Sequence, residues 1–188
     1  MARSPSYVRY AALAQLRLAD LLFLQGRYPA AIARYTAFVS QQRSNPNMPY
    51  ARFGAASGYF EQLPTDLAIL PPAYEGDQSM AIEARRELRR FIRDFPISRF
   101  AGKAGSMLTA VERLLCDHEL YVADFYDEKD KPQAVAWRLS GAIDTYPKCA
   151  LTEENVWRLG EAYAKAGGQS GAIKAYTLYL EKFPSGER

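Results

Sequence analysis

The stretch RLGEAYAKAGGQSGAIKAYTLYLEKFP, residues 158–184, decides the fold class. Its residue types favour helices, yet Gly160 lies inside the first half, where glycine costs about 1 kcal/mol relative to alanine. Gly167-Gly168 ends a first helix and Phe183-Pro184 ends a second, so the stretch predicts an antiparallel helix pair. A small residue at Gly160, opposite Ala172, would let the two helices approach closely. Alanine is therefore expected to be tolerated at position 160, and leucine is not.

The spacing within this stretch follows a known repeat. The tetratricopeptide pattern is L-G-x2-Y, then A-x3-F, then P, in a unit of about 34 residues. Tyr176 replaces the phenylalanine, and the matching residues are Leu159, Gly160, Tyr163, Ala172, Tyr176 and Pro184. The pattern predicts an all-α fold built from helix hairpins.

The same unit recurs upstream. GRYPAAIARYTAF, from Gly26, aligns with GGQSGAIKAYTLY, from Gly167, so that Ala31 and Tyr35 correspond to Ala172 and Tyr176. Repeats are predicted at about residues 7–46, 49–96, 98–147 and 151–184. The prediction for residues 1–188 is a single tetratricopeptide-repeat solenoid domain of four hairpins and about eight helices. One unusually long helix is expected near residues 98–126.

The segment PTDLAILPPAYEGD, residues 64–77, interrupts the second repeat and is too long for a hairpin turn. Two interpretations stay open: a surface loop, or a segment that contacts a partner through its apolar LAIL and PPAY parts.

The overall composition excludes several classes of protein. A net charge of +3 in 188 residues is too small to predict a nucleic-acid partner. The sequence contains no apolar run near the roughly 20 residues of a membrane span, and no signal peptide opens it. Cys116 and Cys149 fit neither a CxxC motif nor a metal-site spacing, so they are interpreted as small hydrophobic residues rather than a disulfide pair.

The residues that could carry catalysis have structural explanations. His118 lies on the apolar seam of the long helix, without a paired nucleophile or an orienting carboxylate. Five arginines between Arg85 and Arg93 alternate with acidic residues at helical pairing distance, which predicts a solvated, salt-bridged face. The sequence therefore predicts a protein that is not an enzyme and has no cofactor or metal site.

Residues 91–147 carry a closer likeness. An aromatic-proline pair, Phe95-Pro96, is followed by Ser98-Arg99-Phe100, and the long helix ends in the box YVADFY at residues 121–126. The next helix has Arg-x-x-Gly, from Arg138 to Gly141, at its centre. With these features the chain resembles the BamD (ComL) family of outer-membrane assembly lipoproteins, and the likeness extends more loosely over nearly the whole chain.

The resemblance implies a periplasmic scaffold of the β-barrel assembly machine at the outer membrane. Its C-terminal repeats would hold the POTRA region of the barrel protein BamA, and its N-terminal repeats would receive unfolded outer-membrane proteins. Other lipoproteins of the machine would be further partners. The family's counterpart of Arg138 contacts BamA, so Arg138 is the first predicted partner-binding residue, and Trp137 and Lys131 are the other two.

The resemblance also has departures. The chain corresponds to the family from its second repeat onward, and no lipobox cysteine occurs near its start. The expectation is a truncated chain or a soluble relative, with membrane contact only through a lipid anchor that this chain lacks. Two alternatives stay open: a periplasmic cell-envelope adaptor similar to CpoB, which coordinates envelope constriction with peptidoglycan synthesis, and a cytoplasmic adaptor.

Overall fold

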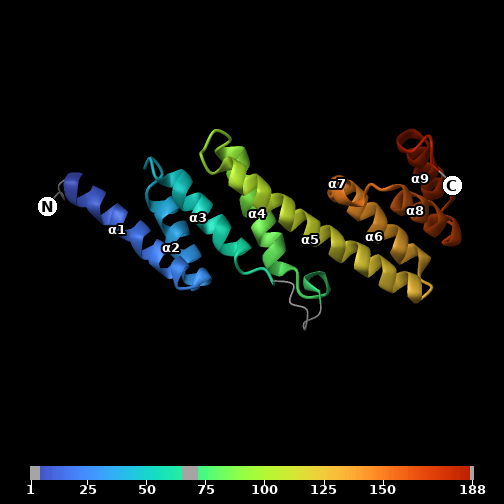
Figure 1. Cartoon of the computed structure of the whole chain (residues 1–188), viewed down its shortest axis with the longest axis horizontal. Coiled ribbons are helices and arrows are strands. Elements are labelled where there is room, and N and C mark those ends of the chain that lie inside the picture. The colour runs from blue at the N-terminus through green and yellow to red at the C-terminus, as the bar shows by residue number, and fades with distance from the viewer. Residues whose placement is uncertain (1–4, 65–71, 187–188) are drawn as a thin grey trace. The chain divides into compact units, whose positions relative to one another are not determined.

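The computed structural model describes residues 5–64 and 72–186, and over these ranges the chain contains helices and no strands (Figure 1). The described residues form two compact units, which divide within the longest helix at about residue 111. None of the helices in these ranges is long and apolar enough to cross a membrane.

The first unit holds α1 (Pro5–Leu24), α2 (Tyr28–Gln41), α3 (Met48–Phe60), α4 (Ser79–Asp94) and the start of α5 (Ala101–Glu128). The second unit holds the rest of α5 with α6 (Pro132–Thr145), α7 (Pro147–Ala150), α8 (Glu153–Lys165) and α9 (Gln169–Lys182). A 3-10 turn, η1, spans Ala73–Glu75.

Successive helices pack on one another within each unit, as α1 on α2, α2 on α3 and α3 on α4, and as α6 on α8 and α8 on α9. The predicted all-α fold of tetratricopeptide hairpins is confirmed. The predicted long helix is confirmed as α5, which has 28 residues. A single domain and the four repeat boundaries stay predictions.

Proline and capping residues explain where helices begin. Proline occupies the first turn of α2, α3, α6 and α7, where its missing N–H would have no helical partner. The Thr152 hydroxyl accepts from the Asn155 backbone N–H at 3.2 Å and caps α8, and Glu153 and Glu154 follow at the positive end of its dipole. Gly167 follows α8 with φ of 77°, a left-handed conformation that glycine adopts without strain.

One carboxylate joins three helices in the first unit. Asp20 Oδ1 on α1 accepts hydrogen bonds from the hydroxyls of Tyr35 on α2, at 2.7 Å, and Tyr50 on α3, at 2.6 Å. Burial, followed by the bond to Asp20, raises the pKa of both tyrosines, so both remain protonated donors. The contact fixes the spacing of the first three helices.

The Asp20→Leu variant is expected to lower the free energy of unfolding by about 1–3 kcal/mol more than Asp20→Asn. Leucine leaves two partly buried hydroxyls without their acceptor, whereas the asparagine oxygen can still accept. Urea unfolding of both variants gives the comparison. Equal losses would mean that the hydroxyls find water instead.

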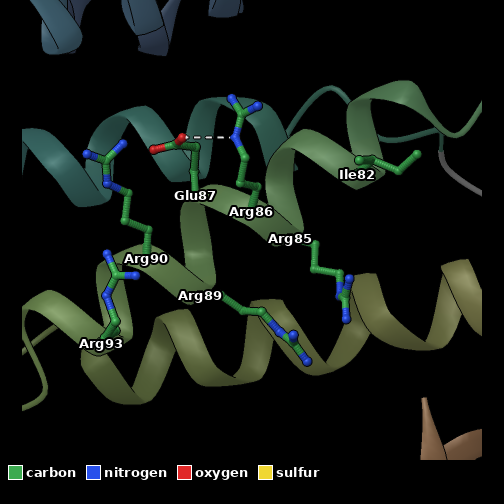
Figure 2. Close-up of a pocket in the computed structure, with 7 residues that line it drawn as sticks. All are labelled: Ile82, Arg85, Arg86, Glu87, Arg89, Arg90 and Arg93. Carbon is green, nitrogen blue, oxygen red and sulfur yellow. Dashed lines mark hydrogen bonds and ion pairs between the residues drawn. The ribbon is translucent and has the colours of Figure 1, made fainter. Parts of the chain in front are cut away.

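The face of α4 away from the core carries the predicted arginine stripe, which borders a surface hollow of about 680 Å³ (Figure 2). Arg86 pairs with Glu83 on the preceding turn and with Glu87, at 3.4 Å. Asp94 pairs with Arg93 at 2.9 Å and with Arg90 at 3.8 Å. The predicted salt-bridged face is confirmed at these positions, and the intrahelical carboxylates offset much of its charge.

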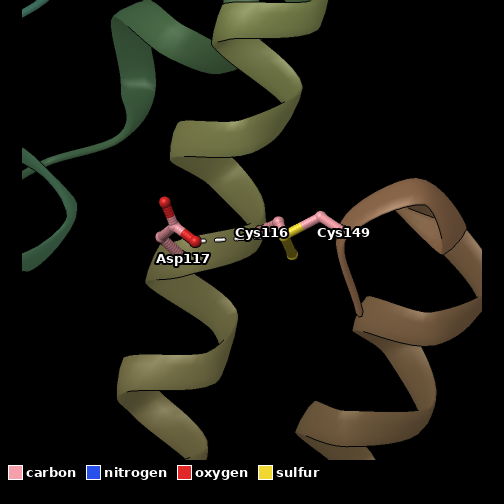
Figure 3. Close-up of side chains that lie close together, drawn as sticks. All are labelled: Cys116, Asp117 and Cys149. Atoms are coloured by element: carbon pink, nitrogen blue, oxygen red, sulfur yellow. Dashed lines mark hydrogen bonds between the residues drawn. A yellow bond between two sulfur atoms is a disulfide. The ribbon is translucent and has the colours of Figure 1, made fainter. Parts of the chain in front are cut away.

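The interpretation of the two cysteines as unpaired hydrophobic residues is wrong. Cys116 on α5 and Cys149 on α7 form a disulfide in the second unit (Figure 3). Their separation of 33 residues shows no local motif, but the α5–α6 hairpin brings their Cα atoms to 6.4 Å, within the range a disulfide requires. Cys116 is fully buried, so it is both a hydrophobic residue of the core and one half of the disulfide.

Gly160 lies under an aromatic ring of its own hairpin. A Cβ added at Gly160 would meet the ring of Tyr176, at 2.7 Å from Cζ and 2.8 Å from Cδ1. Atoms at such distances overlap, so alanine also requires the ring to move. The Tyr176 ring occupies the space that a side chain at position 160 would need, so Gly160→Ala is now expected to be destabilising, though less so than Gly160→Leu.

The end of the 64–77 insert is anchored to α5, within the second unit. The His118 ring nitrogen Nδ1 lies 2.6 Å from the Tyr74 carbonyl oxygen, and the Tyr74 ring packs on Tyr121 with centroids 5.6 Å apart. His118 therefore has a structural contact on the seam of the long helix. The LAIL part of the insert, and with it the choice between loop and partner contact, lies outside the described residues.

Candidate partner-binding site

Two of the residues predicted from the family resemblance, Trp137 and Arg138, line a groove on the second unit. Its lining comes from α5 and from α6 with the turn that follows, and its volume is about 370 Å³. The lining residues are Glu119, Trp137, Arg138, Gly141, Thr145 and Tyr146. Two of the three predicted partner-binding residues, Arg138 and Trp137, thus lie together.

Arg138 is held by a carboxylate of the same chain. Its Nη1 donates to Glu119 Oε2 at 3.0 Å, and the two side chains are 41% and 28% exposed. A guanidinium has five N–H donors in a planar fork, so one bond to Glu119 orients the group while other donors can still reach a second carboxylate. The arginine is an oriented donor rather than a freely solvated one.

Sequence reasoning missed Glu119, and local spacing gives no signal for it. The pair joins α5 to α6 across 19 residues, so a search for helical i,i+4 partners does not find it. Glu119 could have been found by assuming that α5 and α6 form an antiparallel hairpin. A search of α5 for an acidic residue opposite Arg138 would then have identified it.

The surroundings of Arg138 are exposed and carry residue types that are common in protein interfaces. Trp137 is 67% exposed, which is unusual for so large an aromatic side chain. A Cβ added at Gly141 would meet nothing within 4 Å, so the surface beside Arg138 is open. Tryptophan and arginine are the residue types enriched in the parts of interfaces that dominate binding energy.

The core of the second unit keeps α6 in place under this surface. Val135, Ala136 and Leu139 are buried against α5 and α8 residues that include Ala123 and Val156. Trp137 and Arg138 lie on the other face of α6, away from this core. Burial of Val135, Ala136 and Leu139 therefore leaves that face exposed.

Lys131 does not line the groove. It is the N-cap residue of α6 and is exposed, seven residues before Arg138. Seven residues are about two helical turns, or roughly 10 Å, along the same face. Its part in partner binding stays a prediction.

A second cluster of side chains, Cys116, Asp117 and Cys149, has the residue types of a metal site. Both sulfur atoms are used in the disulfide and offer no thiolate ligands. The Asp117 carboxylate pairs instead with Arg113, whose Nε donates to Oδ1 at 2.9 Å. The cluster is structural.

Comparison with known proteins identifies the family. A family model described as outer membrane lipoprotein, YfiO, matches residues 5–178. The outer membrane protein assembly factor BamD of Rickettsia prowazekii is 28% identical over 167 residues, which are 89% of this chain and 63% of the relative. The protein of the same name from Xylella fastidiosa is 23% identical over 180 residues, 95% of this chain and 62% of the relative.

The chain thus spans about three-fifths of the length of these curated relatives. Among solved structures, the crystal structure of the MamA protein is similar over 91% of both chains, at 15% sequence identity and a TM-score of 0.33, which is too low to add to the family assignment. The family match covers nearly all of the described residues. The chain belongs to the YfiO family of outer membrane lipoproteins.

Proposed function

We propose that this chain is a non-enzymatic scaffold in the assembly of outer-membrane proteins, and that it binds a protein partner through the groove around Arg138. The observation that carries the proposal is the family match over residues 5–178, with relatives named as outer membrane protein assembly factors. The same match favours this function over a constriction adaptor similar to CpoB.

The disulfide supports a periplasmic location. Disulfides persist in oxidising compartments such as the periplasm and are rare in the cytosol, where thiols are kept reduced. The Cys116–Cys149 bond therefore argues against the cytoplasmic adaptor.

The partner that the groove fits is an acidic protein surface, and the family resemblance suggests the POTRA region of BamA. Glu119 orients the Arg138 guanidinium, and an incoming carboxylate can take the remaining donors in a two-bond contact. Trp137 supplies apolar area that excludes water from the ion pair. Receipt of unfolded outer-membrane proteins by the first unit, and contact with further lipoproteins, belong to the same proposal.

The test is a titration of the BamA periplasmic region against the wild-type chain, Arg138→Ala and Arg138→Lys. Loss of a charge partner that becomes desolvated in the complex costs about 2–5 kcal/mol, so Arg138→Ala is expected to weaken binding at least about 30-fold. Arg138→Lys is expected to fall between the two, because an ammonium cannot form the planar two-bond contact.

Arg113→Ala is the matched control, because Arg113 also pairs with a carboxylate of the second unit, Asp117, and does not line the groove. Circular dichroism first establishes that all variants fold alike. Equal affinities for Arg138→Ala and Arg113→Ala would remove Arg138 from the interface.

A further inference from the structure

We propose that the Cys116–Cys149 disulfide is a positioning element of the partner-binding groove, so that partner affinity depends on whether this bond is formed. This inference rests on the proposed function and concerns the same groove. The disulfide connects the α5 wall, which carries Glu119, to the wall at the end of α6, which carries Tyr146.

Each half of the disulfide lies one helical turn from a groove residue. On α5, Cys116 precedes Glu119 by three residues, so Cβ atoms at the two positions lie on neighbouring turns of one face. On the other side, the Cys149 backbone N–H donates to the Tyr146 carbonyl at 2.9 Å. A covalent bond between the two cysteines therefore fixes the distance between the two walls.

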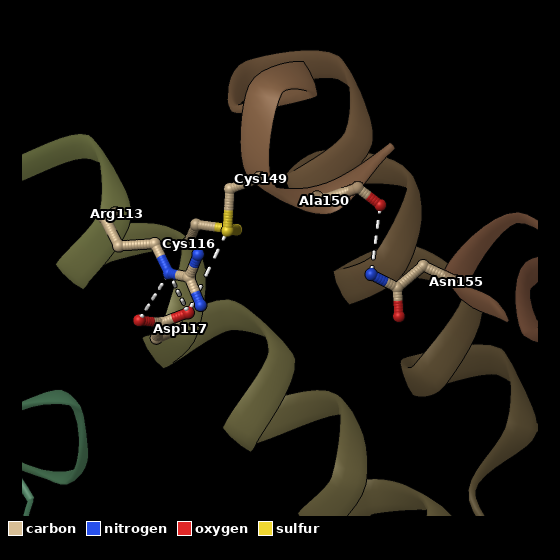
Figure 4. Close-up of a disulfide and its surroundings, with 6 residues drawn as sticks. All are labelled: Arg113, Cys116, Asp117, Cys149, Ala150 and Asn155. Carbon is tan, nitrogen blue, oxygen red and sulfur yellow. Dashed lines mark hydrogen bonds and ion pairs between the residues drawn. A yellow bond between two sulfur atoms is a disulfide. The ribbon is translucent and has the colours of Figure 1, made fainter. Parts of the chain in front are cut away.

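The Tyr146 wall is held by packing and by one covalent bond, because Tyr146 packs against the core of the second unit and Ala150 is fully buried in that core. Tyr146 ends α6 and begins α7, which has only four residues and is too short to be stable by itself. On the side of α7 away from α5, the Asn155 side-chain amide donates to the Ala150 carbonyl at 3.0 Å (Figure 4). The disulfide is the covalent anchor on the α5 side.

Arg138 lines the same groove as Glu119 and Tyr146, the residues that mark the two walls. Its guanidinium is oriented by Glu119, on the wall that holds Cys116, and Tyr146 closes the other side of the groove. Without the disulfide, the α6–α7 turn gains freedom that a partner must remove on binding. Ordering one or two side chains or a short turn is expected to weaken binding roughly threefold to tenfold.

The experiment combines the disulfide with Arg138. Affinity for the BamA periplasmic region is measured for the wild-type chain, for Cys116→Ala/Cys149→Ala, for Arg138→Ala and for the triple variant. If the disulfide acts by positioning Arg138, its removal weakens binding roughly threefold to tenfold in the wild-type background and has almost no effect in the Arg138→Ala background. Equal effects in both backgrounds, or no effect in either, would overturn the positioning role.

Tyr179→Phe is the control for loss of stability alone. The substitution removes the hydrogen bond from the Tyr179 hydroxyl to Glu153, at 2.7 Å, in the same unit and away from the groove. It is expected to leave partner affinity unchanged. A loss of affinity equal to that of the cysteine variant would mean that general destabilisation explains both.

Amide hydrogen exchange gives a readout that needs no partner and uses the natural sequence. The wild-type chain is compared in its oxidised form and after treatment with a phosphine reductant under native conditions. Faster exchange is expected at the backbone amides of Tyr146 and Cys149, with little change in the first unit. Unchanged exchange at these amides would overturn the positioning role of the disulfide, even if the BamA region binds. Faster exchange in a chain that does not bind the BamA region would count against the proposed function alone.

Discussion

Loss of the Cys116–Cys149 disulfide is expected to lower the free energy of unfolding by about 3–4 kcal/mol, because the bond closes a loop of 33 residues. The crosslink removes conformations from the unfolded chain, and the entropy of loop closure at this length corresponds to that range. Chemical denaturation of the oxidised wild-type chain and of Cys116→Ala/Cys149→Ala measures the difference.

The reduced wild-type chain separates the crosslink from the packing of the side chains. It keeps both sulfur atoms in the core but lacks the covalent bond, so it is expected to lose nearly as much stability as the double alanine variant. If the reduced chain unfolds at the same denaturant concentration as the oxidised one, the two cysteines act only as the small hydrophobic residues that their spacing indicated.

Gly160→Leu is expected to lower the free energy of unfolding by roughly 3 kcal/mol, at the upper end of the range for overpacking. The Tyr176 ring occupies the space into which any side chain at position 160 would extend. That ring is half-buried and packs against Trp157, with centroids 5.2 Å apart, so moving it would disturb a second aromatic contact. Gly160→Ala is expected to be destabilising as well, though less than leucine.

A double-mutant comparison tests this account of Gly160 more sharply than single variants. In the wild-type background Gly160→Ala forces the Tyr176 ring to move and lowers stability. In a Tyr176→Ala background the clash is absent, and the same substitution is expected to raise stability by up to about 1 kcal/mol through helix propensity. Thermal melts of the four proteins show whether the sign changes, and an equal loss in both backgrounds would contradict the contact.

The helical hairpins could be predicted because their signals are local. Glycine and proline mark the ends of α8 and α9, and the spacing of Leu159, Gly160 and Tyr163 reports a helix packed on its neighbour. The length of α5 followed from an apolar seam that continues through residue 125. These patterns depend on residues a few positions apart, which the sequence shows directly.

The missed features join residues that are distant along the chain. The contacts of Asp20 with Tyr35 and Tyr50 span 15 and 30 residues, and the disulfide spans 33. Such pairs depend on how the hairpins stack, which single-residue spacing does not report. The partner of Gly160 was also misassigned. Ala172 and Tyr176 lie one turn apart on the same helix, so the spacing alone does not show which of the two lies over Gly160.

The candidate site could be predicted only in part. Arg138 came from the family resemblance, and Gly141 came with it as the last residue of the Arg-x-x-Gly element. Glu119, which orients the guanidinium, is on another helix and gave no signal. The partner-binding roles of Arg138, Trp137 and Lys131 remain predictions that binding experiments must test.

On the proposed function, the α6 surface at Trp137 and Arg138 faces a partner in outer-membrane protein assembly. The most direct measurement is site-specific photo-crosslinking in cells, with a photoreactive phenylalanine derivative in place of Trp137. Ile173 on α9 is the control position, because it belongs to the same unit and is 66% exposed against 67% for Trp137. We predict a crosslink to the periplasmic region of BamA from position 137 that is absent from position 173. No BamA adduct from position 137, or equal adducts from both positions, would contradict the account.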